Sequence, residues 1–158
     1  MKAATEHIAS VLRRARCAAG LTQTELATLI GTDQSAISAY EGAAKRPSAS
    51  TVRNILLMIR PRPSVTLYRH RDEVLAVMNE YGIERPRVFG SVARGTDTWR
   101  SDIDFLVTVR REPGASVLRR MFALIERLER IFGPGRVDLF EDSSLPQGSA
   151  IKRDAIPL

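Results

Sequence analysis

A Gly-Ser pair and two nearby aspartates are the residues of this chain whose types and spacing best suit chemistry. Gly90 and Ser91 follow a short apolar run, and ten residues separate Ser91 from the pair Asp102 and Asp104. A Gly-Ser turn between a strand and a helix presents backbone N–H groups and a hydroxyl to an anionic phosphate. Aspartates two positions apart on a strand project from the same face and can share a divalent cation.

A third carboxylate could complete this site. Asp138 lies in a Val-Asp-Leu run that predicts a strand. Carboxylates as close as those of Asp102 and Asp104 repel each other unless a cation lies between them. We therefore expect Mg²⁺ or Mn²⁺ to bind at Asp102, Asp104 and Asp138. Solvated carboxylates at a strand edge are the alternative, and the Gly-Ser pair at this spacing disfavours it.

The elements that must position these residues alternate between helical and strand patterns. Apolar residues at helical spacing predict helices over residues 67–81 and 117–131. Strands are predicted at residues 87–89, 103–109 and 136–141, the second because Ile103, Phe105, Val107 and Val109 alternate along it. This half of the chain is therefore expected to be an α/β or α+β domain with a small mixed sheet.

Residues 67–158 resemble the minimal nucleotidyltransferases of the polymerase-beta-like superfamily. The resemblance rests on Gly-Ser, ten residues and Asp-X-Asp, with the Ala-Arg-Gly and Ser-Asp extensions of the minimal branch. It implies that Gly90 and Ser91 bind the triphosphate of a nucleotide such as ATP. Arg94 is expected to contact the polyphosphate or, alternatively, to pair with a local acid.

The same resemblance assigns roles to the carboxylates. It implies that Asp102 and Asp104 coordinate two metal ions, and that Asp138 binds the catalytic ion and helps to deprotonate the attacking hydroxyl. The expected reaction is an in-line attack on the α-phosphate, with charge stabilised on the entering and leaving oxygens.

Residues 1–60 carry only helical patterns. A first helix ends before Gly20, and Thr22 opens a second one with Glu25 in capping-box position. Gly31 ends the second helix in the manner of a left-handed cap, and a third helix spans residues 34–41. The fourth helix is marked by Val52, Ile55, Leu56 and Ile59.

The segment from residue 21 to residue 42 resembles the phage-repressor-like helix-turn-helix family, and the resemblance extends over about residues 7–59. The matching features are the opening Thr-Gln, the turn glycine, the Ile-Ser of the third helix and a final Glu-Gly. It implies that residues 34–40 form the recognition helix of a domain that binds operator DNA, commonly as a dimer. A helical interaction module that binds no DNA is the alternative.

Two sets of DNA contacts follow from this resemblance. Amide and hydroxyl groups suit purine edges, so the expected base-reading residues are Gln34, Ser35 and Ser38. The expected phosphate contacts are Gln23, Lys45 and Arg46. The family also pairs Arg16 with Glu41, which we interpret as structural.

Composition and charge agree with two domains. We expect a helix-turn-helix domain at residues 1–60, a Pro-containing linker at residues 61–66 and the catalytic domain at residues 67–158. Residues 1–60 hold 8 Lys and Arg against 4 Asp and Glu, a net charge of +4 out of +6 for the chain, which suits a polyanionic partner. No apolar run approaches a membrane span and the start is no signal peptide, so we expect a cytoplasmic protein. The lone Cys17 is expected to be a small core residue.

A catalytic domain of this size leaves little room for a dedicated acceptor pocket, so we expect a macromolecular acceptor. Minimal nucleotidyltransferases are commonly antitoxins that transfer AMP to a tyrosine of a HEPN-type ribonuclease toxin. The resulting hypothesis is an antitoxin that adenylylates its cognate toxin, autoregulates its operon and forms a homodimer or a hetero-oligomer with the toxin. The alternatives are a sequestering antitoxin or transcription regulator with an inactive nucleotide site, and an enzyme that modifies RNA or a small molecule.

Overall fold

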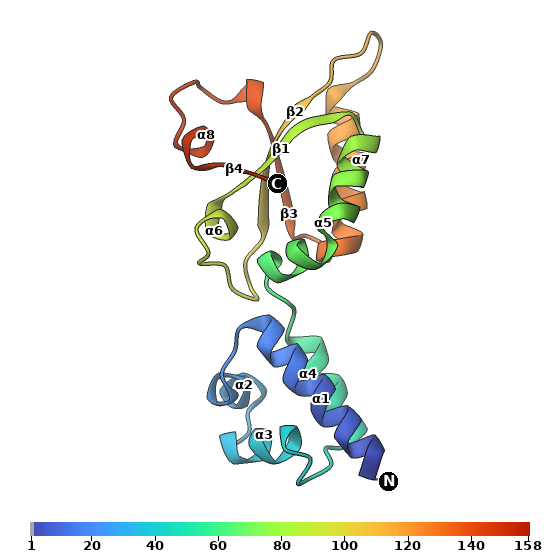
Figure 1. Cartoon of the computed structure of the whole chain (residues 1–158), viewed down its shortest axis with the longest axis vertical. Helices are drawn as coiled ribbons and strands as arrows, with labels where there is room; N and C mark the ends of the chain where they lie inside the picture. Colours follow the sequence, from blue (N-terminus) through green and yellow to red (C-terminus); the bar gives the residue numbers. More distant parts are fainter. Residues whose placement is uncertain (1) are drawn as a thin grey trace. The chain divides into compact units, whose positions relative to one another are not determined.

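The computed structural model describes residues 2–158, and the chain divides into two compact units between Arg62 and Pro63. Figure 1 shows the first unit as a group of helices and the second as a sheet with helices. Within residues 2–158, no helix combines the length and the apolar character needed to span a membrane.

The first unit consists of four helices, as predicted. They are α1 (Lys2–Ala19), α2 (Gln23–Ile30), α3 (Gln34–Glu41) and α4 (Ala49–Met58). The four helices share a core, to which each contributes one side chain that is only 1% exposed to solvent. These side chains are Leu12, Leu26, Ile37 and Ile55. The apolar face of each short helix is thus buried against the other helices. This packing stabilises helices that would be too short to persist alone in water.

The predicted capping of α2 is confirmed. The Thr22 side chain accepts a hydrogen bond from the Glu25 N–H at 3.1 Å, and the Thr22 N–H donates to the Glu25 carboxylate at 2.7 Å. Gly31 follows α2 with φ 70° and ψ 42°, a left-handed cap. Local interactions therefore fix both ends of α2, and the turn that follows is held by hydrogen bonds from the Gly31 and Thr32 N–H groups to carbonyls of α2.

One prediction for this unit was wrong. Cys17 is exposed, since the buried positions of this turn of α1 are Ala18 and Ala19. The apolar neighbours of Cys17 in sequence therefore do not share its face of the helix.

The second unit begins with α5 (Pro63–Glu80), four residues earlier than predicted. The expected linker of residues 61–66 is therefore partly helical. Proline is favoured at the first position of a helix, because its fixed φ suits the helix and the N–H that it lacks would have no partner there. The helix is kinked at His70, where φ is −115° and ψ is 20°.

The sheet is small and mixed, as predicted, and has the strand order β3-β2-β1-β4. Its strands are β1 (Ile83–Phe89), β2 (Ile103–Val109), β3 (Val137–Glu141) and β4 (Ile156–Pro157). β1 is antiparallel to β2 and β4, and β2 is parallel to β3. The parallel pair is connected by the long helix α7 (Val117–Phe132), as a parallel connection requires.

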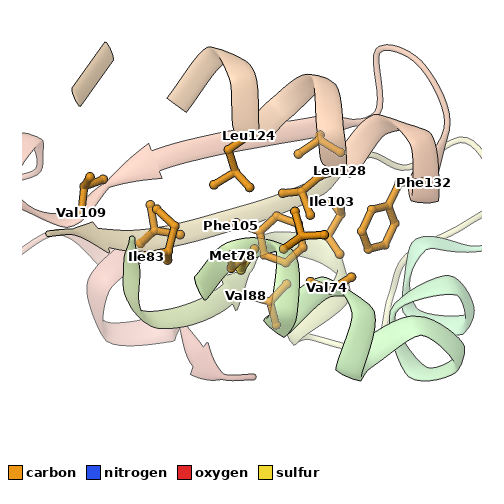
Figure 2. Packing of buried hydrophobic residues seen from close by; sticks show 13 residues of the cluster. Val74, Met78, Ile83, Val88, Ile103, Phe105, Val109, Leu124, Leu128 and Phe132 are labelled. Carbon is orange, nitrogen blue, oxygen red and sulfur yellow. The ribbon is translucent and has the colours of Figure 1, made fainter. Parts of the chain in front are cut away.

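One face of the sheet is covered by α5 and α7, which Figure 1 shows side by side. Phe105 of β2 is fully buried and meets Phe132 of α7 edge to face, with ring centroids 5.9 Å apart. Figure 2 shows these rings packed with Val74 and Met78 of α5 and Leu128 of α7. This core fixes the alternation of β2, so that the side chains between its core residues point to the opposite face of the sheet.

The C-terminal elements and the first half of β1 were not predicted. A short 3₁₀ helix, η1 (Asp142–Ser144), precedes α8 (Ala150–Asp154) and the edge strand β4. β1 starts at Ile83 rather than at residue 87, and its register shifts between Glu84 and Arg87. Arg85 has φ 51°, which is a turn conformation and not an extended one. The proline that follows it is also more typical of a turn than of a strand, so the sequence shows no strand pattern here.

Candidate active site and DNA-binding surface

The Gly-Ser pair and the aspartates lie at one end of strands β1, β2 and β3. Phe89, the last residue of β1, pairs with Asp104, and Asp104 pairs with Asp138. Gly90 follows Phe89 directly and opens the single-turn helix α6 (Gly90–Ala93). Asp104 therefore sits on the middle strand, flanked by the Gly-Ser turn on one side and by Asp138 on the other.

Gly90 and Asp104 approach each other closely. Gly90 has φ +67°, and a Cβ atom built on it would lie 3.1 Å from Cγ of Asp104 and nearer still to Oδ2. Only glycine combines this backbone conformation with an open space for the carboxylate. The turn after β1 and the carboxylate of β2 thus fit together as one site.

The three carboxylates also act on one another electrostatically. Burial raises the pKa of the Asp104 carboxyl above its ordinary value, and the negative charges of Asp138 and Asp102 raise it further. Arg94 acts in the opposite direction and partly offsets this rise in pKa. The site therefore concentrates negative charge around Asp104. A bound cation would offset the repulsion between these carboxylates.

Asp102 and Asp138 are exposed and Asp104 is half-buried. Within residues 2–158, no three Asp, Glu, His or Cys side chains are grouped closely enough to form a ready-made metal site. The donor chemistry still fits Mg²⁺ or Mn²⁺, because these ions prefer carboxylate oxygens and the Asp104 carboxyl is destabilised by its neighbours. The aspartates would have to close around such an ion.

The Gly-Ser turn leads into a short ordered loop. The carbonyl of half-buried Ser91 accepts the N–H of Thr96 at 2.9 Å. Arg94 caps α6, is exposed and forms none of the ion pairs found among residues 2–158. Its predicted pairing with a local acid is therefore not formed, although its charge reaches Asp104.

Two buried polar residues near the site were missed by sequence reasoning. Asp97, only 5% exposed, accepts the N–H of Ser64 at 2.8 Å and so ties the loop before Asp102 to the first turn of α5. Arg136, 6% exposed, donates to the carbonyl of Ser101. A lone charged residue beside a loop or before a strand gives no signal of burial in a single sequence, because most such residues are solvated.

A second charged cluster lies on the same face of the sheet as Asp104. Arg87 of β1 and Lys152 of α8 both pair with Asp142, with a Lys152–Asp142 distance of 3.2 Å. Burial alone would raise the pKa of Asp142, but hydrogen bonds from Arg87 and Lys152 outweigh it and hold the pKa below its ordinary value. The Lys152 side chain is only 12% exposed. The cluster fastens the C-terminal segment to the sheet.

In the first unit, the expected base-reading side chains lie on the surface. Gln34, Ser35 and Ser38 are exposed on α3, and Lys45 and Arg46 are exposed after it. Gln23 is different, because its amide donates to Glu41 at 3.1 Å and its carbonyl accepts from Gln34 at 2.8 Å. Its contact with phosphate would require a rearrangement of these bonds.

The predicted pair of Arg16 and Glu41 is confirmed. Arg16 donates to both carboxylate oxygens of Glu41, at 2.7 and 2.8 Å, and also to the Leu21 carbonyl. The Glu41 side chain is 4% exposed. This bidentate pair joins α1 to the end of α3 and so restrains the orientation of α3.

Comparisons with known families agree with this division of the chain. The family model described as a helix-turn-helix domain matches residues 7–57, and the one described as a nucleotidyltransferase domain matches residues 71–155. The second match covers more than half of the chain. No curated protein matches the chain.

Two solved structures are similar to the second unit. A candidate minimal nucleotidyltransferase is 38% identical, with a TM-score of 0.52, and the match covers 60% of this chain and 95% of that one. A candidate nucleotidyltransferase from Sulfolobus solfataricus is 24% identical, with a TM-score of 0.39, over 60% of this chain and 80% of that one. The first likeness supports the predicted polymerase-beta-like fold and the minimal form of the domain.

Proposed function

Because the chain belongs to the nucleotidyltransferase domain family, we propose that it transfers AMP from ATP to a hydroxyl of a cognate toxin and thereby silences it. The observation that carries this proposal is the register Phe89–Asp104–Asp138, which brings the Gly-Ser turn and two acids to one end of the sheet. This adjacency of the turn to the carboxylates supports the proposal, because nucleotidyl transfer requires phosphate-binding and carboxylate groups to lie together.

The residues have distinct roles in this proposal. Gly90 and Ser91 cradle the triphosphate, and Arg94 supports its outer charge. The acceptor hydroxyl attacks the α-phosphorus, a new O–P bond forms, and the bond to the β-phosphate breaks to release pyrophosphate. Asp138 takes the hydroxyl proton, directly or through water.

Asp102, Asp104 and Asp138 would hold Mg²⁺ or Mn²⁺. Such ions, when bound, stabilise negative charge on the entering and leaving oxygens. The raised pKa of Asp104 favours this assignment, because charge that repels its neighbours is stabilised once a cation is shared.

The acceptor that we propose is a protein, specifically a tyrosine of a HEPN-type toxin. Asp102 and Asp138 are exposed rather than enclosed, so a hydroxyl on a large partner can reach them. The helix-turn-helix unit supports the further proposal that the chain binds its own operator and represses its operon. Both activities belong in the cytoplasm, where ATP and operator DNA are found.

A second candidate is a sequestering antitoxin whose nucleotide site is inactive. One observation favours it, namely that the described residues contain no closed group of metal ligands. The two candidates differ in whether the toxin gains covalent mass.

The deciding experiment measures the intact mass of the product of the neighbouring gene after incubation with this protein, ATP and Mg²⁺. The control is the Asp102→Asn/Asp104→Asn double variant. Mass gained in whole AMP units, with the wild type alone, would establish protein adenylylation. A stable complex without mass gain would favour sequestration, and neither result would redirect the search to RNA or small-molecule acceptors.

A further inference from the structure

Arg136 is a buried charged residue at the beginning of β3. It is 6% exposed and directly precedes Val137, the first residue of the strand. A guanidinium group keeps its charge in proteins, so its burial is unfavourable unless its N–H groups are hydrogen-bonded. The contacts of Arg136 therefore show what its burial serves.

The hydrogen bonds that Arg136 forms with Ser101 and Ile103 lie on either side of Asp102. The Arg136 guanidinium donates to the carbonyl of Ser101, from Nη2 at 2.6 Å and from Nε at 3.3 Å. The backbone carbonyl of Arg136 accepts the N–H of Ile103 at 2.9 Å. One residue thus holds the peptide before Asp102 with its side chain and the peptide after it with its backbone.

Asp102 needs such a contact because it lies outside the strand ladder. The pairing of β2 with β3 begins at Ile103 and Val137 and fixes Asp104 beside Asp138. Asp102 precedes the first paired residue, so the ladder does not determine its position. The Arg136 side chain reaches back from β3 to the last residue before Asp102 and supplies the missing constraint.

We propose that Arg136 is a positioning residue that holds Asp102 in place relative to Asp104 and Asp138 for cation binding. This inference rests on the proposed function of the three aspartates. Residues that orient metal ligands from outside typically change metal affinity by about 10- to 100-fold when they are removed.

The test compares Arg136→Met with Arg120→Met in the full chain. Arg120 is a matched control, since it is also a largely buried arginine that donates to a backbone carbonyl, that of Arg110. Arg110 follows the other end of β2, away from Asp104. Both variants lose a guanidinium–carbonyl hydrogen bond, and only the first loosens the segment that carries Asp102.

Two readouts are measured for each variant. Hydrogen exchange of the peptide spanning residues 98–103 reports whether the segment is held. Loss of the electron paramagnetic resonance signal of free Mn²⁺, with a non-hydrolysable ATP analogue present, reports cation binding. We expect Arg136→Met to speed exchange in residues 98–103 and to weaken Mn²⁺ binding about tenfold or more, whereas Arg120→Met does neither.

Arg136→Lys provides a rescue, because an ammonium can still donate to the Ser101 carbonyl. It should recover part of the Mn²⁺ affinity that Arg136→Met loses. Unchanged exchange in Arg136→Met, or faster exchange with unchanged Mn²⁺ affinity, would overturn the inference. A wild type that binds no Mn²⁺ would instead count against the proposed function, and the exchange arm alone would then decide whether Arg136 holds the segment.

Discussion

The carboxylate of Asp104 occupies the space into which a Cβ atom on residue 90 would project. Glycine is needed at this position for two reasons. Its φ is +67°, and a Cβ atom added to it would lie 3.1 Å from Cγ of Asp104. The last residue of β1 thus leads into a turn whose shape depends on a side chain from β2. The Gly-Ser motif and the Asp-X-Asp motif are therefore one structural feature.

Gly90→Ala should remove transferase activity while leaving the protein folded. The added methyl group must displace the Asp104 carboxylate, and a displacement of about 1 Å in an active site can lower the rate about 100-fold. Gly95→Ala is the control, because Gly95 has a similar φ of +69° but open space around it. Both variants should lose about 1 kcal/mol of stability from backbone strain, and equal activity losses in the two would contradict the role of the Asp104 contact.

Asp104→Asn should stabilise the protein in the absence of metal and abolish its activity. Because the pKa of Asp104 is raised, the folded state favours the protonated carboxyl, and stability is lost as pH rises through that pKa. Asparagine carries no charge and avoids this loss. The difference in free energy of unfolding between variant and wild type should therefore grow as pH rises above the unfolded pKa of about 3.9. Added Mn²⁺ should stabilise only the wild type, and a variant less stable than the wild type in chelator would refute this account.

Glu41→Gln should destabilise the helix-turn-helix unit. It leaves Arg16 without its carboxylate partner in a largely buried setting, which typically costs about 3 kcal/mol. Burial would raise the pKa of Glu41, but hydrogen bonds from Arg16 and Gln23 outweigh it and lower the pKa. The pair therefore contributes above the unfolded pKa of about 4.3, and its contribution is lost as pH falls through the folded value.

Urea unfolding of the full chain at several pH values measures this effect. Glu84→Gln is the control, since Glu84 and its partner Arg110 are about half exposed and such pairs contribute less than about 1 kcal/mol. The loss caused by Glu41→Gln should shrink as pH falls below the unfolded pKa of about 4.3. A loss that does not depend on pH would show that the charge of Glu41 is not what stabilises the unit.

Variants of the DNA-binding surface should separate base readout from phosphate contact. Gln34→Ala should lower affinity for the operator by about 1–3 kcal/mol and relax its sequence preference. Arg46→Ala should weaken binding to all sequences and reduce the slope of log affinity against log salt by about one. Fluorescence anisotropy with operator and scrambled duplexes measures both. Binding that neither substitution affects would contradict these contacts, and a wild type that binds neither duplex would indicate a helical interaction module.

The elements with strong periodic patterns could be predicted from sequence, and the polar contacts between them could not. The capping box at Thr22 and the alternation of β2 are local in sequence, so their residues alone determine them. The burial of Asp97 and Arg136 depends on Ser64 and Ser101, which lie more than thirty residues away. No local pattern records such a partner.

The placement of the site residues was predictable to a similar degree. The spacing from Ser91 to Asp104 is enough to place the Gly-Ser turn and the Asp-X-Asp pair at one end of the sheet. Whether Asp138 sits beside Asp104 depends on the parallel register that α7 brings about, which sequence alone did not determine. The burial of Lys152 depends in the same way on Asp142, a partner in a different element.

The hydrogen bond from Ser64 to Asp97 has a consequence for engineering the protein. It anchors the connection between β1 and β2 near its midpoint, so lengthening that connection on either side of Asp97 would release either the Gly-Ser turn or the Asp102 segment. The loop between β2 and α7 is exposed at residues 112–114, and Gly114 has open space around it. The contacts of Glu112 in this loop are with Arg120 and Ala115, and neither of these residues belongs to the site. A fluorescent reporter or a split point is therefore best introduced there.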